Sequence, residues 1–377
     1  MNKLIRGRLL KNKKTKNLIP FMRQGDILLI DHKDIDEITA EAFIKAKVKA
    51  ILNTQLSCSG KYPNPGPLNI VENGIILIDS ISPDIWEKTE EVSEVIIKKG
   101  KIYDSKNEIL GFGKIKTITN LKCELEEAQR NFGPQMEGFI KNTIEWANKE
   151  LKRIFDKIDM SHIKTDFEKK HCLIVVRGQK YKEDLQAIRS YMREMNPVLV
   201  GVDGGADALL EVGFIPDLIV GDMDSVSDKA LLCGAEIVVH AYPDGRAPGM
   251  ERLKNLGLKD MKILPTFGTS EDVAMLLAFE KGAELIVAVG THSNVIDFME
   301  KGRRGMASTF LVRLKIGSIL IDARGVNQLY RQRLKPKYLA EMVAAALLPF
   351  IVVFIVSPPA FQLARLIFLR LRLLLQV

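Results

Sequence analysis

Short apolar runs alternate with helical segments between residues 172 and 321, and this alternation constrains the fold more than any other feature. The runs are continuously apolar, which is typical of parallel strands covered by helices on both faces. The sequence therefore predicts an α/β fold with a parallel, Rossmann-like sheet. We expect its strands at residues 172–176, 198–202, 217–220, 235–240, 261–264, 285–289 and 318–321.

Two acidic turns follow neighbouring strands of this predicted sheet. An Asp-Gly-Gly-Ala turn begins at Asp203, and a Gly-Asp-Met-Asp-Ser turn contains Asp222 and Asp224. Ligands of open parallel sheets bind beyond the carboxyl ends of the strands. Glycines allow the backbone to approach a phosphate closely, and paired carboxylates suit Mg²⁺. We therefore expect a metal-bound diphosphate here, with Asp222 and Asp224 as metal ligands and the turn at Asp203 beside the phosphates.

The N-terminal part, residues 17–115, is predicted to be a smaller α/β domain. A strand-like run at 26–31, a helical pattern at 35–47 and a second run at 48–52 form a β-α-β pattern. A loop rich in proline and glycine follows at 57–67. It is either a structural crossover or a ligand-binding loop, with the polar candidates Asn53, Ser57, Ser59, Lys61 and Asn64.

Residues 116–168 are polar and are predicted to form a helical connector between the two domains. We expect helices at 123–130 and 136–158. The second domain is then expected to occupy residues 169–330.

The basic charge is concentrated at the two ends of the chain. Residues 1–16 and 331–377 each contain seven basic residues, and Glu341 is their one acid. The remainder has 41 basic and 46 acidic residues, a net charge of −5. This argues against a nucleic-acid-binding body, which would carry its basic surface on the fold itself. Residues 1–16 form a basic tail, either a solvated arm or a segment that contacts anionic lipid.

The C-terminal segment, 331–377, is predicted to be a membrane anchor. Residues 338–356 comprise 19 residues with one charge, Glu341, a helix of about 28 Å against a hydrocarbon thickness of roughly 30 Å. Its preceding basic residues place it at the cytoplasmic face of the cell membrane; they are Arg331, Arg333, Lys335 and Lys337. A buried core helix is the alternative. Residues 360–377 could exit, lie in the interface or return through the bilayer.

The two acidic turns and the segment Gly213-Phe-Ile-Pro-Asp-Leu-Ile-Val between them resemble the nucleotide-binding half of thiamin pyrophosphokinases. That resemblance implies ATP and Mg²⁺ as ligands and transfer of pyrophosphate to an alcohol. The family's acidic helix start appears here as Thr269-Ser-Glu-Asp, and a later arginine and histidine are replaced by Val295 and Phe298. The resemblance implies Asp203 as a metal ligand together with Asp222 and Asp224. The implied catalytic residues are Asp203, Asp222, Asp224 and Asp272, and the implied nucleotide-binding residues are Arg177, Gly178, Gly204, Gly205, Ser225, Arg246, Thr269, Ser270 and Asp297.

Motifs along nearly the whole chain resemble the SteA family. They include Gly60-Lys-Tyr-Pro-Asn-Pro-Gly-Pro, Tyr242-Pro-Asp-Gly-Arg-Ala-Pro-Gly and Gly302-Arg-Arg-Gly-Met-Ala-Ser-Thr. This resemblance implies a membrane-anchored nucleotide- or diphosphate-binding protein of bacterial cell division or cell separation, with a division-machinery partner. We also expect a homodimer. The alternatives are an active diphosphokinase on thiamin or a similar alcohol, and a scaffold whose former site binds nothing.

Overall fold

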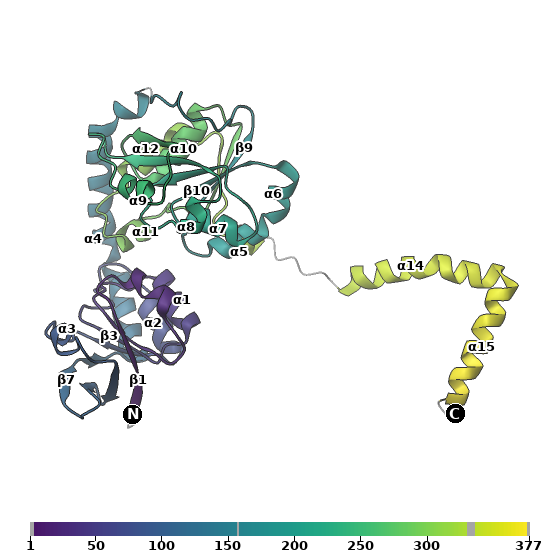
Figure 1. Cartoon of the computed structure of the whole chain (residues 1–377), viewed down its shortest axis with the longest axis horizontal. Helices are drawn as coiled ribbons and strands as arrows, with labels where there is room; N and C mark the ends of the chain where they lie inside the picture. The colour runs from purple at the N-terminus through teal and green to yellow at the C-terminus, as the bar shows by residue number, and fades with distance from the viewer. Residues whose placement is uncertain (1–3, 157, 330–335, 375–377) are drawn as a thin grey trace. The chain divides into compact units, whose positions relative to one another are not determined.

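The computed structural model describes residues 4–156, 158–329 and 336–374. They form two compact units, Met1–Val326 and Asn327–Val377, and the first contains two β-sheets (Figure 1). A single long helix, α4, links the chain segments that build these sheets.

The first sheet has eight strands in the order β7-β6-β5-β1-β2-β3-β4-β8. Strands β1 to β4 pair in parallel, while β5 and β8 join its two edges antiparallel. The strands are Ile5–Lys11 (β1), Ile27–Ile30 (β2), Ala50–Asn53 (β3), Ile76–Asp79 (β4), Glu94–Lys98 (β5), Lys101–Tyr103 (β6), Ile109–Phe112 (β7) and Lys114–Ile115 (β8). The helices are Glu37–Ala46 (α1), Gly66–Glu72 (α2) and Ile85–Lys88 (α3), with short 3₁₀ turns at Thr15–Asn17 and Ile19–Phe21.

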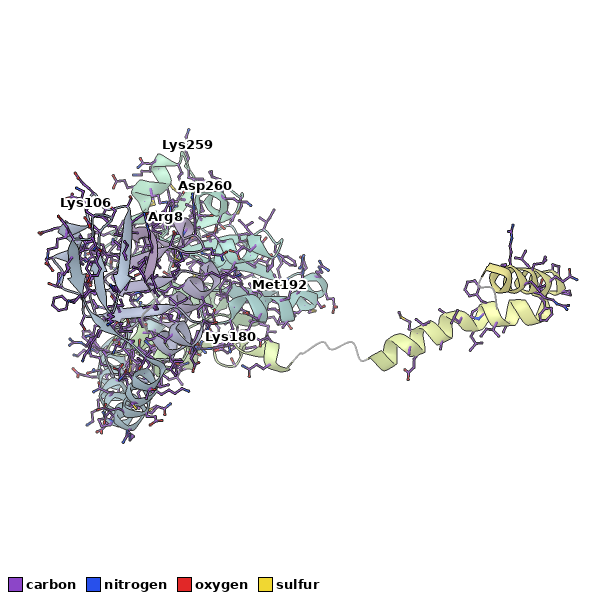
Figure 2. All side chains as sticks on the ribbon, turned by 90° about the horizontal axis from the view of Figure 1, so that it is seen from below. Arg8, Lys106, Lys180, Met192, Lys259 and Asp260 are labelled. Carbon is purple, nitrogen blue, oxygen red and sulfur yellow. The ribbon has the colours of Figure 1, made fainter. Side chains whose placement is uncertain are left out.

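The expected basic tail differs from the structure, because its residues 5–11 form the interior strand β1. Arg8 (Figure 2) donates to both carboxylate oxygens of Asp26, at 2.9 and 2.6 Å. Arg6 donates to Glu94 at 2.6 Å. The sequence showed a run of positive charge, but the acids that pair with it lie 18 and 88 residues away along the chain.

Helix α4, Ile118–Glu150, is one continuous helix of 33 residues. The expected break between two shorter helices is absent from it, although Pro134 lies in its interior. The helix contacts α2 of the first sheet and α12 (Ala307–Ile316) of the second. These contacts stabilise α4 across the proline, which by itself would disfavour a continuous helix.

The second sheet confirms the predicted parallel α/β architecture. Its seven strands lie in the order β13-β12-β11-β10-β9-β14-β15, and every neighbouring pair is parallel. The chain extends the sheet outward from β9 to β13 and then returns to the other side of β9. The strands are His171–Val175 (β9), Val198–Val202 (β10), Leu218–Gly221 (β11), Glu236–Ala241 (β12), Met261–Pro265 (β13), Leu285–Val289 (β14) and Leu320–Asp322 (β15).

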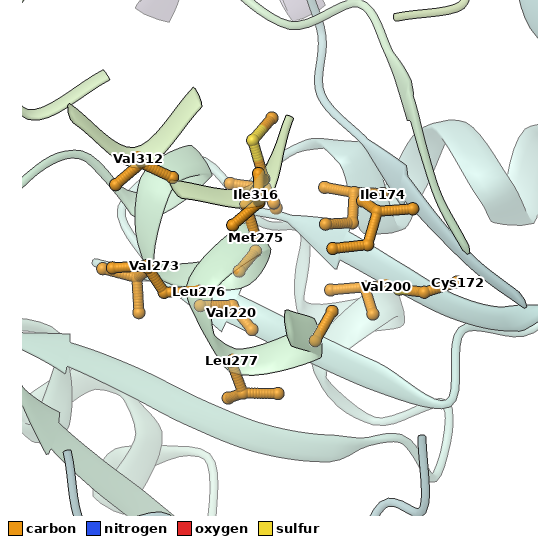
Figure 3. Close-up of a cluster of buried hydrophobic side chains, with 14 of the residues drawn as sticks. Cys172, Ile174, Val200, Val220, Val273, Met275, Leu276, Leu277, Val312 and Ile316 are labelled. Carbon is orange, nitrogen blue, oxygen red and sulfur yellow. The ribbon is translucent and has the colours of Figure 1, made fainter. Parts of the chain in front are cut away.

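Helix α10, Ser270–Glu280, lies at the centre of the largest core. Its residues Val273 to Leu277 pack between strand residues such as Ile174 and Val220 and residues Val312 and Ile316 of α12 (Figure 3). The helix is therefore apolar on nearly all sides, as expected of a buried helix. The remaining elements are a 3₁₀ turn at Arg153–Phe155 and the helices Tyr181–Ala187 (α5), Arg189–Met195 (α6), Gly205–Glu211 (α7), Asp228–Leu231 (α8), Gly249–Asn255 (α9), Val295–Glu300 (α11) and Val326–Leu329 (α13).

The C-terminal unit contains helices α14, Pro336–Val356, and α15, Pro358–Leu374. No helix in the described part of the chain is both long and apolar enough to cross a membrane. The predicted transmembrane segment is therefore wrong. The charge-free stretch of α14 is residues 342–356, which at 1.5 Å per residue extends about 22 Å, short of the roughly 30 Å hydrocarbon layer. Arg331, Arg333 and Lys335, which we expected to flank it, lie outside the described residues.

Candidate functional site

The two acidic turns meet at the carboxyl edge of the second sheet. Strands β10 and β11 pair in register, with Val202 opposite Val220. Asp203 follows β10 directly, and Asp222 follows β11. The sheet thus brings together two carboxylates that are 19 positions apart in the sequence.

Asp203 is held in an unusual conformation by its surroundings. Its backbone has a positive φ of 48°, and its Oδ1 accepts a hydrogen bond from Met223 N at 3.3 Å. A β-carbon on Gly221 would come within 1.8 Å of this oxygen. Burial, with the Asp222 carboxylate as the next cause, raises the pKa of Asp203 to about 7. Asp203 is therefore close to half-protonated near neutral pH.

The turn after β11 exposes its carboxylates while its backbone is fixed. Asp222, Asp224 and Ser225 are all exposed, and Asp224 N donates to Asp222 Oδ1 at 3.0 Å. The Met223 side chain is fully buried and anchors the turn. Arg252 donates to two backbone carbonyls of the turn, Met223 O at 2.6 Å and Val226 O at 2.8 Å. Sequence reasoning missed Arg252, whose contribution depends on α9 lying beside the turn.

The glycines after Asp203 have a packing role. A β-carbon on Gly205 would lie 1.8 Å from Val175 O of β9, so only glycine lets α7 begin this close to the sheet. Gly204 packs against the Arg177 side chain in the same way, since a β-carbon on it would lie 2.8 Å from Arg177 Cδ. Gly178 approaches the backbone of Gly290.

The two arginines expected near phosphate already have acidic partners. Arg177 lies 3.3 Å from Glu211 and 3.9 Å from Asp207. Arg246 is exposed and forms an ion pair with Asp244 at 2.7 Å. Both pairs are at the surface, where such interactions contribute little and can exchange for a ligand.

Thr269, Ser270 and Asp272 form the start of α10. Thr269 is the N-cap, and Asp272 completes a capping box with it. Asp272 also accepts hydrogen bonds from Ser308 at 2.8 Å and Thr309 at 3.1 Å, and only 1% of it is exposed. The structure thus uses Asp272 to bind α10 to α12 instead of presenting it to a ligand.

His240 is a site residue that sequence reasoning missed. Its Nε2 lies 3.3 Å from Thr266 O, and its Nδ1 lies 3.4 Å from Ser270 Oγ. Burial lowers the pKa of His240, and Asp222 is among the charges that act on it. Because a carbonyl only accepts, Nε2 carries the proton and Nδ1 accepts from Ser270. The sequence did contain a signal for His240, because it is a polar residue at the carboxyl end of the predicted strand 235–240.

Asp297 lies on the other side of β9, after β14, and the structure does not place it with the acidic turns. It closes a capping box with Asn294 at the start of α11. Its carboxylate forms a two-pronged ion pair with Arg324, and Arg324 also donates to Gln179 at 2.8 Å.

A resident metal site made entirely of protein is not evident. The described residues contain no group of three or more His, Cys, Asp or Glu side chains arranged to hold a metal ion. Mg²⁺ commonly takes only one or two carboxylates, with phosphate oxygens and water completing its shell. The pair Asp203 and Asp222 fits a metal that arrives with a diphosphate.

Comparison with known proteins agrees with parts of this description. The model of the SteA-like C-terminal domain matches residues 324–375. A 6-hydroxymethyl-7,8-dihydropterin pyrophosphokinase of Methanocaldococcus jannaschii is 33% identical over 111 residues, covering 28% of this chain and 42% of the relative. The chain thus spans less than half of this relative.

Among solved structures, the thiamine pyrophosphokinase from Bacillus subtilis is similar at 22% identity, with a TM-score of 0.26, over 41% of this chain and 61% of that one. This structural likeness is too weak to locate a site. The sequence matches confirm the resemblance to SteA-like proteins and to pyrophosphokinases: the chain carries a SteA-like C-terminal domain.

Proposed function

We propose that the second domain binds the diphosphate of a nucleotide through Mg²⁺ held by Asp203 and Asp222. The observation that carries this proposal is the pairing of a half-buried carboxylate with an exposed one at the ends of adjacent parallel strands. A half-buried carboxylate beside a second acid is unfavourable unless a cation offsets the repulsion. Asp224 and Ser225, on the same exposed turn, are available to water or phosphate around the metal.

The chemistry of this pair favours a Mg²⁺-nucleotide complex over a bare anion. Asp203 and Asp222 would hold the Mg²⁺ that accompanies a nucleotide, which would supply positive charge against the phosphates. Asp203 would lose its proton when it binds the cation, because the pKa of about 7 allows both forms at neutral pH. The resemblance of the sequence to a pyrophosphokinase supports ATP as the nucleotide to test first.

Pyrophosphate transfer to an alcohol is the alternative function. It is favoured by His240, whose neutral imidazole lies in a chain of contacts with Ser270. It is disfavoured by Asp272 and Asp297, since their carboxylates are engaged in capping boxes and bonds to Ser308, Thr309 and Arg324. We therefore propose binding as the primary function.

The SteA-like C-terminal domain supports a proposed role in bacterial cell division or cell separation. In that role, nucleotide binding would regulate contact with a protein of the division machinery. Homodimerisation remains a prediction, to be checked by light scattering of the full chain.

Titration calorimetry of the full chain with ATP tests the binding proposal. Binding should require Mg²⁺ and be lost in the double variant Asp203→Asn with Asp222→Asn. A charge-matched control, Glu145→Gln with Glu194→Gln, changes two exposed acids elsewhere and should bind as wild type does. ATP binding that survives the loss of both aspartates would refute the assignment of the site.

A second assay separates binding from turnover. AMP release is measured with ATP, Mg²⁺ and either thiamin or 6-hydroxymethyl-7,8-dihydropterin, the alcohol in the relative's name. Release that depends on the alcohol and is abolished by Asp222→Asn would establish the alternative function instead.

A further inference from the structure

A cavity lies away from the acidic turns. It has a volume of about 540 Å³ and is bounded by the loop 57–67 of the first sheet, by α4 and by the segment after α11. This volume is within the range of roughly 300–1,000 Å³ found for small-molecule sites. The cavity brings together the proline- and glycine-rich loop and the Gly-Arg-Arg-Gly segment, which are more than 200 positions apart in the sequence.

Four cations line this cavity, namely Lys33, Lys61, Arg303 and Arg304. Among the ion pairs of residues 4–156, 158–329 and 336–374, none involves any of the four. Asp34 also lines the cavity, and both of its carboxylate oxygens accept from Ser59, at 2.6 and 2.8 Å. The four cations outnumber the acids of the lining, so the lining carries a net positive charge, which suits an anion with several oxygens.

A buried donor also lies in the wall of this cavity. Tyr62 is one of the lining residues and is 3% exposed, and its hydroxyl has no hydrogen-bond partner among the described residues. An unsatisfied buried hydroxyl is destabilising, and a ligand in the adjoining cavity would supply the missing acceptor. Burial raises the pKa of Tyr62, so the hydroxyl remains a donor.

Glu300 is the other acid in the wall of the cavity, and it does not oppose an anion at neutral pH. Burial, followed by the carboxylates of Asp36 and Asp297, raises the pKa of Glu300 to about 8. Its Oε1 is buried and has no partner in the described part of the structure. The protonated carboxyl can donate a hydrogen bond in the same way as Tyr62.

The walls are rigid before any ligand binds. Asn64 donates to Ile35 O at 3.0 Å and accepts from Gly66 N at 3.0 Å, which fixes the loop. On the other side, Asn142 of α4 donates to Arg304 O at 3.2 Å, and Thr143 accepts from Met306 N at 3.1 Å. Preformed walls reduce the entropic cost of binding.

Part of the remaining wall is apolar. Pro134 and Phe139 of α4, together with Met299 of α11, line the cavity beside the cations. A small anion alone would leave this surface uncovered, whereas an aromatic or other apolar group would cover it.

We propose that this cavity binds a small phosphorylated molecule, its phosphate between Arg303, Arg304 and Lys61 and its organic part against Phe139 and Met299. The site needs no metal, since the counter-charge comes from side chains. It is thus separate from the acidic turns, which require Mg²⁺.

Phenyl phosphate in excess EDTA is a suitable probe for titration calorimetry with the full chain. Arg303→Ala with Arg304→Ala should weaken binding about tenfold or more, because charge-assisted bonds to phosphate are lost. The matched control, Arg193→Ala with Lys259→Ala, removes two exposed cations elsewhere (Lys259 is labelled in Figure 2) and should leave the affinity unchanged. Both double variants change exposed side chains, so both should melt as wild type does.

Further measurements test the two halves of the ligand. Inorganic phosphate should bind more weakly than phenyl phosphate, and Tyr62→Phe should weaken phenyl phosphate several-fold through the lost hydroxyl. The proposal is overturned by no binding to the wild type, by equal loss in the control, or by equal affinity for the two phosphates. Binding in EDTA must also persist in Asp203→Asn with Asp222→Asn; its loss there would place the probe at the acidic turn.

Discussion

The carboxylate of Asp203 lies against the Cα of Gly221, so that a β-carbon on this glycine would be 1.8 Å from Oδ1. The last residue of β11 thus determines where the carboxylate after β10 can lie. This relationship makes the geometry of the acidic pair testable without removing either acid.

Gly221→Ala should displace Asp203 and weaken Mg²⁺-dependent ATP binding by tenfold or more, while destabilising the fold by about 1–3 kcal/mol. Calorimetry and denaturant unfolding measure the two effects. Gly138→Ala is the matched control, because a β-carbon there meets nothing within 4 Å on an exposed face of α4. Unchanged Mg²⁺-dependent binding in Gly221→Ala would show that Asp203 does not hold the metal.

The affinity for Mg²⁺-ATP should rise with pH, with a midpoint near the Asp203 pKa of about 7. Below this pH the carboxyl is protonated and cannot bind a cation. Asp203→Asn should remove this pH dependence along with most of the affinity. A wild-type affinity that does not change between about pH 6 and 8 would contradict the assignment.

The same titration affects stability with a defined sign. The pKa of Asp203 is about 7 in the folded protein and 3.8 as its ordinary value, so between these values the folded state binds more protons than the unfolded state. Stability should therefore fall as pH rises through this interval and then level off. Asp203→Asn should exceed wild type in stability at about pH 8, by on the order of 2–4 kcal/mol, and match it near pH 4. Asp224→Asn, at an exposed position, is the control and should follow wild type in urea unfolding at both pH values.

Asp272→Ala should reduce stability by about 2–4 kcal/mol, because it leaves the Thr269 N–H and two buried or half-buried hydroxyls without an acceptor. Asp224→Ala should change stability by less than about 0.5 kcal/mol. Urea unfolding gives both values. A stable Asp272→Ala variant with impaired ATP binding would instead support the catalytic role that the sequence suggested for Asp272.

Arg324 and Asp297 should behave as a coupled pair. Removing either partner, as Arg324→Gln or Asp297→Asn, is expected to cost about 2–4 kcal/mol, since each change leaves the other charged group, buried Asp297 or half-buried Arg324, without its counter-ion. The double variant should lose less than the sum of the two. Additive losses in this cycle would show that the pair is not coupled, and Arg193→Gln serves as an exposed control.

The parallel sheet and the acidic turns could be predicted because both depend on local sequence. Continuous apolar runs such as Val198–Val202 are typical of buried parallel strands, and the carboxyl end of a strand is the usual place for ligand-binding residues. Asp203 and Asp222 therefore came together as expected. Asp272 and Asp297 belong to motifs as well, but the hydroxyls and the guanidinium that engage their carboxylates come from elements far along the chain.

The sequence by itself determined which strands form the second sheet and which acids follow them, because a strand that is buried on both faces must be apolar at every position. Tertiary structure alone decided that the basic N-terminal run forms an interior strand, since its acidic partners are distant in sequence. It also decided that Lys61 and Arg303 share one cavity. The positions of the loops that carry these two residues depend on how α4 packs against α2 and α12, and no local sequence pattern encodes that packing. The C-terminal helix was the opposite case: its extent was foreseen, but Glu341 shortens the charge-free stretch, and no helix in the described part of the chain is long and apolar enough to cross a membrane.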